Sequence, residues 1–409
     1  MMVSVVHVNK GQLAGPFDLN GRVVETITAF LFQAGGDDDP ARLAENANKS
    51  FQGSVVLGMG FTFDDTDKKG IANPISLMND LIRKDPNNAE RIFPYIGGEE
   101  VNSSPIHAYH RYVIGFEKMS ETEARRWPDL MSLLERTVKP DRLSLGDVGD
   151  AGRRKEHWWL WGRYTPSLFS AAQRLERVLV NSQVSKYLCF AFVPGSLVYG
   201  HTLNVFADDS FALFSLLQSR VHEVWARAFA SSLEDRLRYT PSDCFETFPR
   251  PPRLASLDAL EIAGRDYYEC RAALMVRNNE GMTDTYGRFH DPADQDPGII
   301  RLRALQDAMD RTAMAAYGWP TDLPVCDFLL DSQDDVEPEP ERPNRRKDPR
   351  RLRWPDEYCD QVLQRLLELN AARSTASEAA LTGGAAAPKM RKGTTLTTTA
   401  SGRLWDDAT

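Results

Sequence analysis

The sequence predicts an α+β fold, in which a mixed β region is followed by a helical region. Short β-branched and aromatic runs, separated by glycine and proline, recur over residues 51–250. Over residues 251–373, apolar residues instead recur at helical spacing. The chain has 409 residues, of which 42% are hydrophobic and 26% charged, as expected of a globular protein with one large or two ordinary domains.

Residues 1–50 open with the β-branched run from Val3 to Val8. Its apolar side chains fall on both faces of one strand, which is typical of a strand inside a sheet that is covered on both sides. An apolar edge without a partner invites pairing with another chain. We therefore expect this segment of about 50 residues to be labile alone and protected beside a partner chain.

Four elements are predicted between residues 51 and 138. In the first, Gly58 and Gly60 would permit bulges or a close backbone approach. The last opens with a capping box, in which Ser120 and Glu123 satisfy each other's backbone N–H groups. In order, we expect a strand over 51–63, a helix over 76–84, a strand over 109–116, and a helix over 120–138 that breaks or restarts at Pro128.

Residues 146–250 complete the β region. Three glycines and two arginines predict a loop over 146–154, and a helix is expected over 168–180. Asp209 or Ser210 then caps a strongly apolar helix. We assign one face of that helix to the core, namely Phe211, Phe214, Leu217, Val221, Val224 and Trp225.

The helical region has two long predicted helices, over 254–277 and 299–317, with Gly281 and Gly318 as stops. A charged linker follows over 331–353, acidic and then basic. Trp354 to Glu357 opens a last helix, with proline at its first position and acids in its first turn. Its apolar face comprises Val362, Leu363, Leu366 and Leu367. The Ala/Thr/Gly/Ser composition of residues 374–409 predicts a disordered tail.

Composition narrows the class of protein. No apolar run approaches the roughly 18 residues of a membrane span, and the N-terminus does not have the pattern of a signal peptide. The five cysteines are dispersed without a CxxC pair, so we expect neither a zinc site nor a disulfide framework, and a reduced cytoplasm as the compartment. The net charge of −9 argues against a whole-surface polyanion binder but permits a local basic groove.

The first candidate for nucleic-acid contact is the basic and aromatic segment 153–164. Arg153, Arg154 and Lys155 suit phosphate contacts, Arg163 suits guanine readout, and Trp161 can pack on a sugar or an unstacked base. The alternative is a solvated basic loop beside tryptophans that belong to the core. That alternative is favoured for the adjacent Trp158 and Trp159, because paired tryptophans are usually buried.

Two further segments are candidates. The loop from Gly195 to Asn204 joins two strands and carries four side chains that suit base edges, Tyr199, His201, Thr202 and Asn204. A plain hairpin loop is its alternative. The linker residues 342–353 carry six arginines and one lysine that could follow a DNA backbone, the alternative being a solvated charge run.

No catalytic or metal-binding residues are predicted. The sequence has neither a GxSxG elbow nor a recognisable nuclease motif. His107 and His110 lie three residues apart, but His110 falls in the predicted strand over 109–116, so a chance pairing is a better explanation than a metal site. The segment Gly97–Glu100 is interpreted as a turn, because no P-loop lysine follows it.

Five strings of this sequence carry a resemblance to a known family. They are FPYIGGEEVN (93–102), LQSRVHEVWAR (217–227), RYTPSDCFETFP (238–249), RNNEGMTDTYGRFHDP (277–292) and WPDEYCDQVLQRLLELNAAR (354–373). With the initial VSVVH strand, they resemble the type IIL, MmeI-like adenine-N6 DNA methyltransferases of restriction–modification systems. The resemblance extends over residues 3–373.

The resemblance implies that this chain is the C-terminal half of such an enzyme. Residues 1–50 would be the remnant edge of a methyltransferase catalytic domain, 51–250 a DNA target recognition domain, and 251–373 helices packed beside it. The strings 93–102 and 238–249 would be scaffold rather than DNA contacts. The sequence contains no [N/D]PP[Y/F] loop for a flipped adenine.

The function expected from this resemblance is sequence-specific recognition of double-stranded DNA in a restriction–modification or phage-defence system. S-adenosylmethionine and methyl transfer would belong to a catalytic chain or domain that acts as partner. Two alternatives stay open: a stand-alone DNA nuclease with an unrecognised site, and a structural adaptor in a defence complex.

Overall fold

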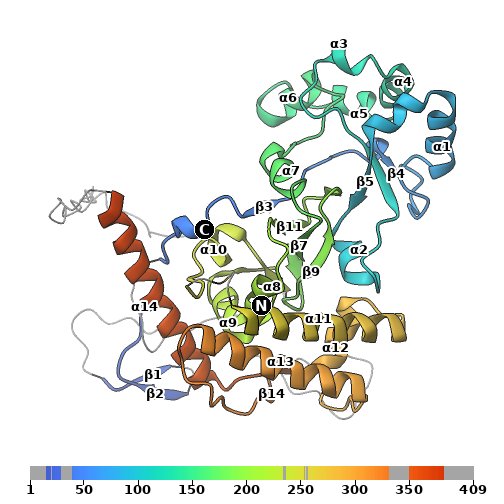
Figure 1. The fold of residues 1–409 in the computed structure, drawn as a ribbon. Coiled ribbons are helices and arrows are strands. Elements are labelled where there is room, and N and C mark those ends of the chain that lie inside the picture. Colours follow the sequence, from blue (N-terminus) through green and yellow to red (C-terminus); the bar gives the residue numbers. More distant parts are fainter. Residues whose placement is uncertain are drawn as a thin grey trace, which may run out of the picture.

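The computed structural model describes residues 15–19, 21–28, 39–233, 236–252, 254, 257–330 and 350–381. The predicted strand Val3–Val8, most of the charged linker and the tail after residue 381 lie outside the described residues. The described chain forms two lobes, each around its own hydrophobic core (Figure 1). The α+β class and the helical C-terminal region are confirmed.

The first lobe contains a four-stranded sheet in the order β10-β5-β6-β4. β5 (Ile92–Ile96) is antiparallel to β6 (Arg111–Ile114), which is in turn antiparallel to β4 (Thr62–Phe63). β10 (Val198–Tyr199) comes from later in the chain and runs parallel to β5. The strands are rich in Ile, Val, Phe and Tyr, which fit a pleated, buried surface.

Short helices surround the core of this lobe (Figure 1). The capping box is confirmed, since the Ser120 hydroxyl accepts a bond from the Glu123 N–H while the Glu123 carboxylate accepts one from the Ser120 N–H. Pro128 is the first residue of the next helix, so the predicted restart is also confirmed. The helices of this lobe are α1 (Ile75–Lys84), α3 (Glu121–Ala124), α4 (Pro128–Thr137), α5 (Lys139–Leu143) and α6 (Gly149–Glu156). Two other short helices, α2 (Gly98–Ser103) and α7 (Pro166–Ala172), bury apolar side chains in the second core instead.

The second lobe contains an antiparallel sheet in the order β3-β11-β7-β9. Helices α8 (Phe211–Gln218) and α9 (Arg220–Phe229) contribute to the same core, and the Ser210 hydroxyl caps α8 by accepting a bond from Leu213 N–H at 3.2 Å. The predicted apolar face is buried, except that Val224 is half-buried. The strands are β3 (Ser50–Gln52), β7 (Arg177–Ser182), β9 (Ala191–Pro194) and β11 (Leu203–Phe206).

The C-terminal helices share this second core. Phe190 and Phe206 belong to one continuous apolar cluster with Leu260, Met309 and Leu366, so the core crosses residue 250 without interruption. The remaining elements of this lobe are β8 (Val184–Ser185), β12 (Ser231–Leu233), β13 (Arg236–Arg238), α10 (Pro241–Cys244), α11 (Asp258–Asn278), α12 (Met282–Phe289), α13 (Pro297–Ala316), β14 (Asp327–Leu330), β15 (Arg350–Arg353) and α14 (Asp356–Leu381). A separate hairpin comprises β1 (Phe17–Leu19) and β2 (Arg22–Val24).

Helical side chains cover the outer edge of β9. The Phe192 N–H donates to the Tyr268 hydroxyl at 3.1 Å, and the preceding Phe190 N–H donates to the Gln218 side chain at 3.1 Å. Arg271 donates to the Phe190 carbonyl at 2.7 Å. The backbone groups of Phe190 and Phe192 at this edge are therefore bonded by side chains of α8 and α11, which hinders pairing of the edge with another chain.

The predicted single strand over 51–63 is wrong. The segment leaves β3 after Gln52 and enters β4 at Thr62, in the sheet of the other lobe. Leu57 and Gly58 have φ angles of 51° and 129°, which turn the chain between the two sheets.

The predicted loop over 146–154 and helix over 168–180 are also wrong in part. Residues 149–156 form α6, which buries no residue and so gives no apolar periodicity. The helix α7 ends at Ala172, and residues 177–182 form β7. Because β7 is almost entirely buried, its sequence does not alternate between apolar and polar residues as a half-buried strand would.

Two predicted helix ends and one predicted turn need correction. The helix α11 ends at Asn278, where Asn279 in the left-handed conformation provides the stop that was predicted at Gly281. Gly97–Glu100 begins the helix α2 instead of forming an isolated turn. The last helix α14 runs to Leu381, so the first part of the predicted disordered tail is helical.

Candidate nucleic-acid interface

Polar side chains gather at one end of the first-lobe sheet. β4, β5 and β10 end there and β6 begins there, because Tyr199 of β10 pairs with Ile96 of β5, and Arg111 of β6 pairs with Tyr95. The loops at this end carry donors and acceptors suited to base edges and phosphates. We use the name sheet-end strip for seven side chains that lie at or beside this end of the sheet: Gln52, Thr66, His110, Arg111, Arg163, His201 and Thr202.

Arg111 is fixed in the middle of this strip. Its guanidinium contacts both carboxylate oxygens of Glu100, with Nη2 to Oε2 at 2.6 Å, and lies 4.9 Å from the centre of the Tyr95 ring. Burial opposes the charged form of Arg111, but the hydrogen bonds and charge of Glu100 outweigh it and raise the arginine pKa. The Glu100 side chain is only 1% exposed, so the carboxylate holds the guanidinium from beneath.

His110 lies next to this ion pair. Its Nε2 atom is 3.2 Å from the Thr66 hydroxyl, and the ring is within 3.9 Å of both Asp64 and Glu100. The imidazole is 42% exposed, so it can contact a ligand at the sheet end while two largely buried carboxylates lie behind it.

His201 and Thr202 connect the strip to the second lobe. Both residues are exposed. The Thr202 hydroxyl accepts a hydrogen bond from the Gly98 N–H at 2.9 Å, and its carbonyl accepts one from the Gln183 N–H at 2.8 Å. These bonds hold the loop in place while the imidazole of His201 stays exposed.

Arg163 is exposed at the junction of the lobes. Its backbone exchanges two hydrogen bonds with Val55, at 2.9 and 3.0 Å. Its Nη2 atom donates to the Gln52 side-chain oxygen at 2.6 Å, and the Gln52 amide donates to the His201 carbonyl at 3.2 Å. Gln52 was not among the residues predicted from the sequence, since a single glutamine in a predicted strand carries no signal.

The helix α6 carries the basic start of the predicted segment, Arg153 to Lys155, and lies close to Arg163, because Arg153 donates to the carbonyl of Gly162. Each of its basic side chains has an acidic partner: Arg153 and Arg154 pair with Asp150 at 2.9 Å, and Lys155 pairs with Asp147 at 2.6 Å. A phosphate would have to compete with these carboxylates.

Arg142 lies behind α6. It is 4% exposed and donates to the Leu57 carbonyl at 2.6 Å. Burial, together with the charges of Arg154 and Arg153, lowers its pKa to about 10. The positive charge near α6 is therefore partly buried under the helix.

A second basic element adjoins the strip and was missed by the sequence reasoning. β13 carries the exposed Arg236 and Arg238 and pairs with β8. Gln183, which precedes β8, donates to the Thr202 carbonyl and accepts from the Tyr239 N–H at 2.8 Å. The arginines of β13 therefore follow the strip on its second-lobe side. Their alternation along a short strand could have been noticed from the sequence.

Three of the predicted contact residues are buried. Trp161 donates its indole N–H to the Ile114 carbonyl at 2.8 Å, and the Tyr199 hydroxyl donates to the Pro194 carbonyl at 2.6 Å. Asn204 is fully buried and donates to both Asn181 and the Tyr239 carbonyl. Since these side chains expose almost no surface to a ligand, we leave them out of the candidate interface. Trp158 and Trp159 are buried as favoured.

The described end of the charged linker is a strand rather than a solvated run. Arg350–Arg353 form β15, which pairs with β14. Arg351 is 4% exposed and donates to the Lys186 carbonyl at 2.5 Å. The other basic residues of the linker, from 342 to 347, lie outside the described residues.

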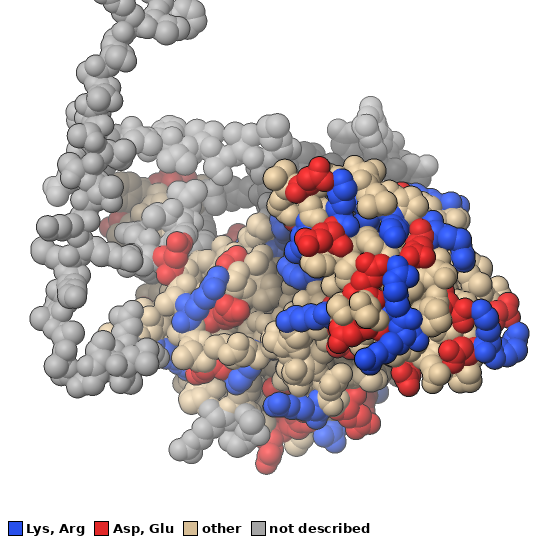
Figure 2. Space-filling model, turned by 90° about the horizontal axis from the view of Figure 1, so that it is seen from above, with Lys and Arg blue, Asp and Glu red and all other residues tan. Residues whose placement is uncertain are grey.

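Basic and acidic side chains alternate over the face seen in Figure 2, with no single-sign field. Such a face fits the net charge of −9 and presents its basic side chains only in small local groups. Among the described residues, no group of three or more His, Cys, Asp or Glu side chains could hold a metal ion. No described helix is long and apolar enough to cross a membrane.

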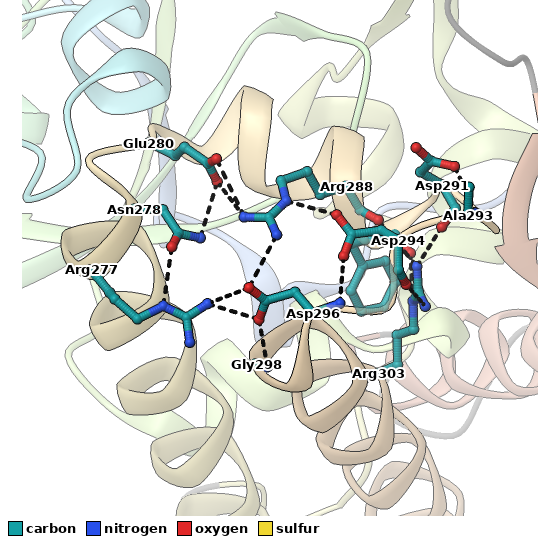
Figure 3. Close-up of polar contacts among 11 residues, drawn as sticks. Arg277, Asn278, Glu280, Arg288, Asp291, Ala293, Asp294, Asp296, Gly298 and Arg303 are labelled. Atoms are coloured by element: carbon teal, nitrogen blue, oxygen red, sulfur yellow. Dashed lines mark hydrogen bonds and ion pairs between the residues drawn. The ribbon is translucent and has the colours of Figure 1, made fainter.

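Side chains of the string 277–292 take part in an ion-pair network with Asp294 and Asp296 (Figure 3). Asp296 caps α13 by accepting from Gly298 N–H at 2.7 Å, and its carboxylate also pairs with Arg277 at 2.7 Å and Arg288 at 3.3 Å. Arg288 additionally pairs with Glu280 at 3.2 Å. These contacts join α11, α12 and α13, so the string has a scaffold role.

The fold and the interface together define a class of protein in which a rigid scaffold presents polar loops at one sheet end. The family model described as "MmeI, target recognition domain" matches residues 45–252, and the chain belongs to that family.

Two further comparisons agree with this assignment. DNA methyltransferase A of Bacillus subtilis (strain 168) is 24% identical over 142 residues, which is 34% of this chain and 15% of that protein. The solved structure of the type IIL restriction–modification enzyme MmeI in complex with DNA matches with a TM-score of 0.59 and 16% identity, over 87% of this chain and 39% of that one. The chain therefore spans well under half of either protein.

Proposed function

We propose that this chain is the DNA-sequence recognition module of an adenine-specific DNA methyltransferase in a restriction–modification or phage-defence system. The observation that carries the proposal is the family match over residues 45–252, which includes the whole sheet-end strip. The similarity in fold to MmeI, solved with DNA, supports a duplex as the ligand.

In this proposal, the sheet-end strip contacts bases, and the neighbouring elements α6 and β13 contact phosphates. His201, Thr202 and Arg163 face base edges from the lobe junction, and the basic side chains of α6 and β13 contact phosphates on either side. Base contacts then supply specificity, whereas phosphate contacts fix the register of the duplex.

The partner is a methyltransferase catalytic domain, which binds S-adenosylmethionine and transfers the methyl group to adenine. The similarity to DNA methyltransferase A supports this pairing. We expect calorimetric titration of this chain alone with S-adenosylmethionine to give no heat of binding. Micromolar binding would mean that the cofactor site lies in this chain.

The test of DNA recognition is a binding-site selection from a randomised duplex library with the purified chain. We expect enrichment of one short sequence, and an affinity that falls steeply with salt. An affinity without any sequence preference would contradict the recognition role. Metal-dependent cleavage of plasmid DNA in a parallel assay would favour a nuclease instead.

A further inference from the structure

We infer that Gln52 is a positioning residue that holds Arg163 as a reader of one guanine in the recognised duplex. This inference rests on the proposed DNA-recognition function. It adds which base is read, a guanine, and which pair of residues selects that base. Gln52 ends β3 of the second lobe, whereas Arg163 is bridged to Val55, which leads into the first lobe.

The backbone beneath Arg163 is rigid. Val55 and Arg163 form an isolated antiparallel bridge with two hydrogen bonds, and Ser54 is bridged to Gly200. The approach between Gly53 and Gly200 leaves no room for a side chain, because a Cβ atom on Gly53 would lie 2.1 Å from the Gly200 carbonyl oxygen. The backbone at Arg163 therefore has little freedom to move.

Gln52 fixes the far end of the same side chain. Its amide oxygen accepts from Arg163 Nη2 at 2.6 Å, and its amide nitrogen donates to the His201 carbonyl at 3.2 Å. The amide thus links the arginine to the loop of His201 and Thr202. Holding a flexible side chain before binding reduces the conformational entropy that binding must overcome.

The guanidinium keeps donors for a ligand. Among the described residues, the Arg163 guanidinium has hydrogen-bond partners only at Nη2, where the second contact, to the Gly53 carbonyl, is long at 3.5 Å. Nη1 and one Nη2 hydrogen can therefore donate together to O6 and N7 of a guanine, which is the commonest specific contact between arginine and a base. By contrast, Arg111 is already engaged by both oxygens of Glu100.

The test compares binding-site selections for three variants with the wild-type chain. We expect Arg163→Ala to lose about ten-fold to a hundred-fold of the preference for guanine at one position. Gln52→Ala should relax the same position, with little further loss in the double variant. Gln52→Glu keeps an acceptor for Arg163, so it should retain the preference while lowering affinity for all duplexes through its added negative charge.

The matched control is Arg311→Ala, an exposed arginine on α13, which should leave every position unchanged. Thermal unfolding of each variant shows that it is folded. If Gln52→Ala lowers thermal stability yet leaves all base preferences intact, then Gln52 only joins the lobes and the inference fails. If the wild-type chain selects no sequence at all, the proposed function fails first, so the two failures are distinguishable.

Discussion

Arg220 provides the sharpest test of how α9 is held to the C-terminal helices. Its Nη1 atom lies 2.7 Å from a carboxylate oxygen of Asp310 and 2.7 Å from one of Asp307, both on α13. The two acids differ in exposure, since the Asp310 side chain is fully buried and the Asp307 side chain is 42% exposed. Asp310 also accepts hydrogen bonds from the Arg220 N–H at 2.8 Å and from Gln306 at 3.2 Å.

We expect Asp310→Ala to lower the free energy of unfolding by about 3–5 kcal/mol, because it leaves a buried guanidinium and a buried N–H without their main partner. Asp307→Ala should lower it by less than about 1 kcal/mol, because water can replace an exposed carboxylate. Urea denaturation followed by circular dichroism measures both values. Equal effects, or a loss below about 1 kcal/mol for Asp310→Ala, would refute the assignment of this pair as the buried link.

Three further predictions concern binding and stability. Replacing Arg153, Arg154 and Lys155 together with alanine should weaken binding to all duplexes alike. In fluorescence anisotropy, the slope of log affinity against log salt concentration should decrease in size by at most about 0.9 per lost phosphate contact. A change of preference at one base position would contradict this prediction. Asp296→Ala should lower the free energy of unfolding by about 1–2 kcal/mol, through loss of the helix cap and the Arg277 contact, without changing the selected DNA sequence. Burial lowers the pKa of His222 to about 3, so the unfolded chain takes up a proton first as the pH falls below about 6.5. Stability should therefore fall between pH 6 and 5, and His222→Gln should reduce that slope by up to about 1.4 kcal/mol per pH unit in urea titrations.

Much of the local structure could be predicted because local signals were strong. The capping box at Ser120, the proline at residue 128 and the cap at Ser210 each depend on a few neighbouring residues, and each is confirmed. The apolar face of α8 and α9 was likewise visible as a helical period. The break between these two helices at Ser219 was not, since the period continues through it.

The missed elements depend on distant contacts. The helix α6 is exposed and is stabilised by ion pairs from Asp150 to Arg153 and Arg154, so it has no apolar period to detect. The change of sheet after Gln52 requires positive φ angles at Leu57 and Gly58, and a leucine in that conformation cannot be inferred from its neighbours.

The candidate interface was predicted only in part, for the same reason. Arg163, His201 and Thr202 are exposed, whereas Asn204 is buried beside Asn181. Along a strand, adjacent residues point to opposite faces, and which face is covered depends on how the sheets and helices pack in the folded chain rather than on residue type. Gln52 was missed because its role depends on a strand end that lies against Arg163 only in the folded chain.

The covered edge of β9 determines where this module can be cut and grafted. The family model ends at residue 252, but Tyr268 and Arg271, which satisfy the backbone beside that strand, lie beyond it. A chimera joined at residue 252 would carry the proposed reading loops and leave the Phe192 N–H and the Phe190 carbonyl without these partners. Transplanting the proposed DNA specificity into another enzyme therefore requires moving α11 together with the sheet that it covers, so the transferable unit is larger than the segment that the family model matches.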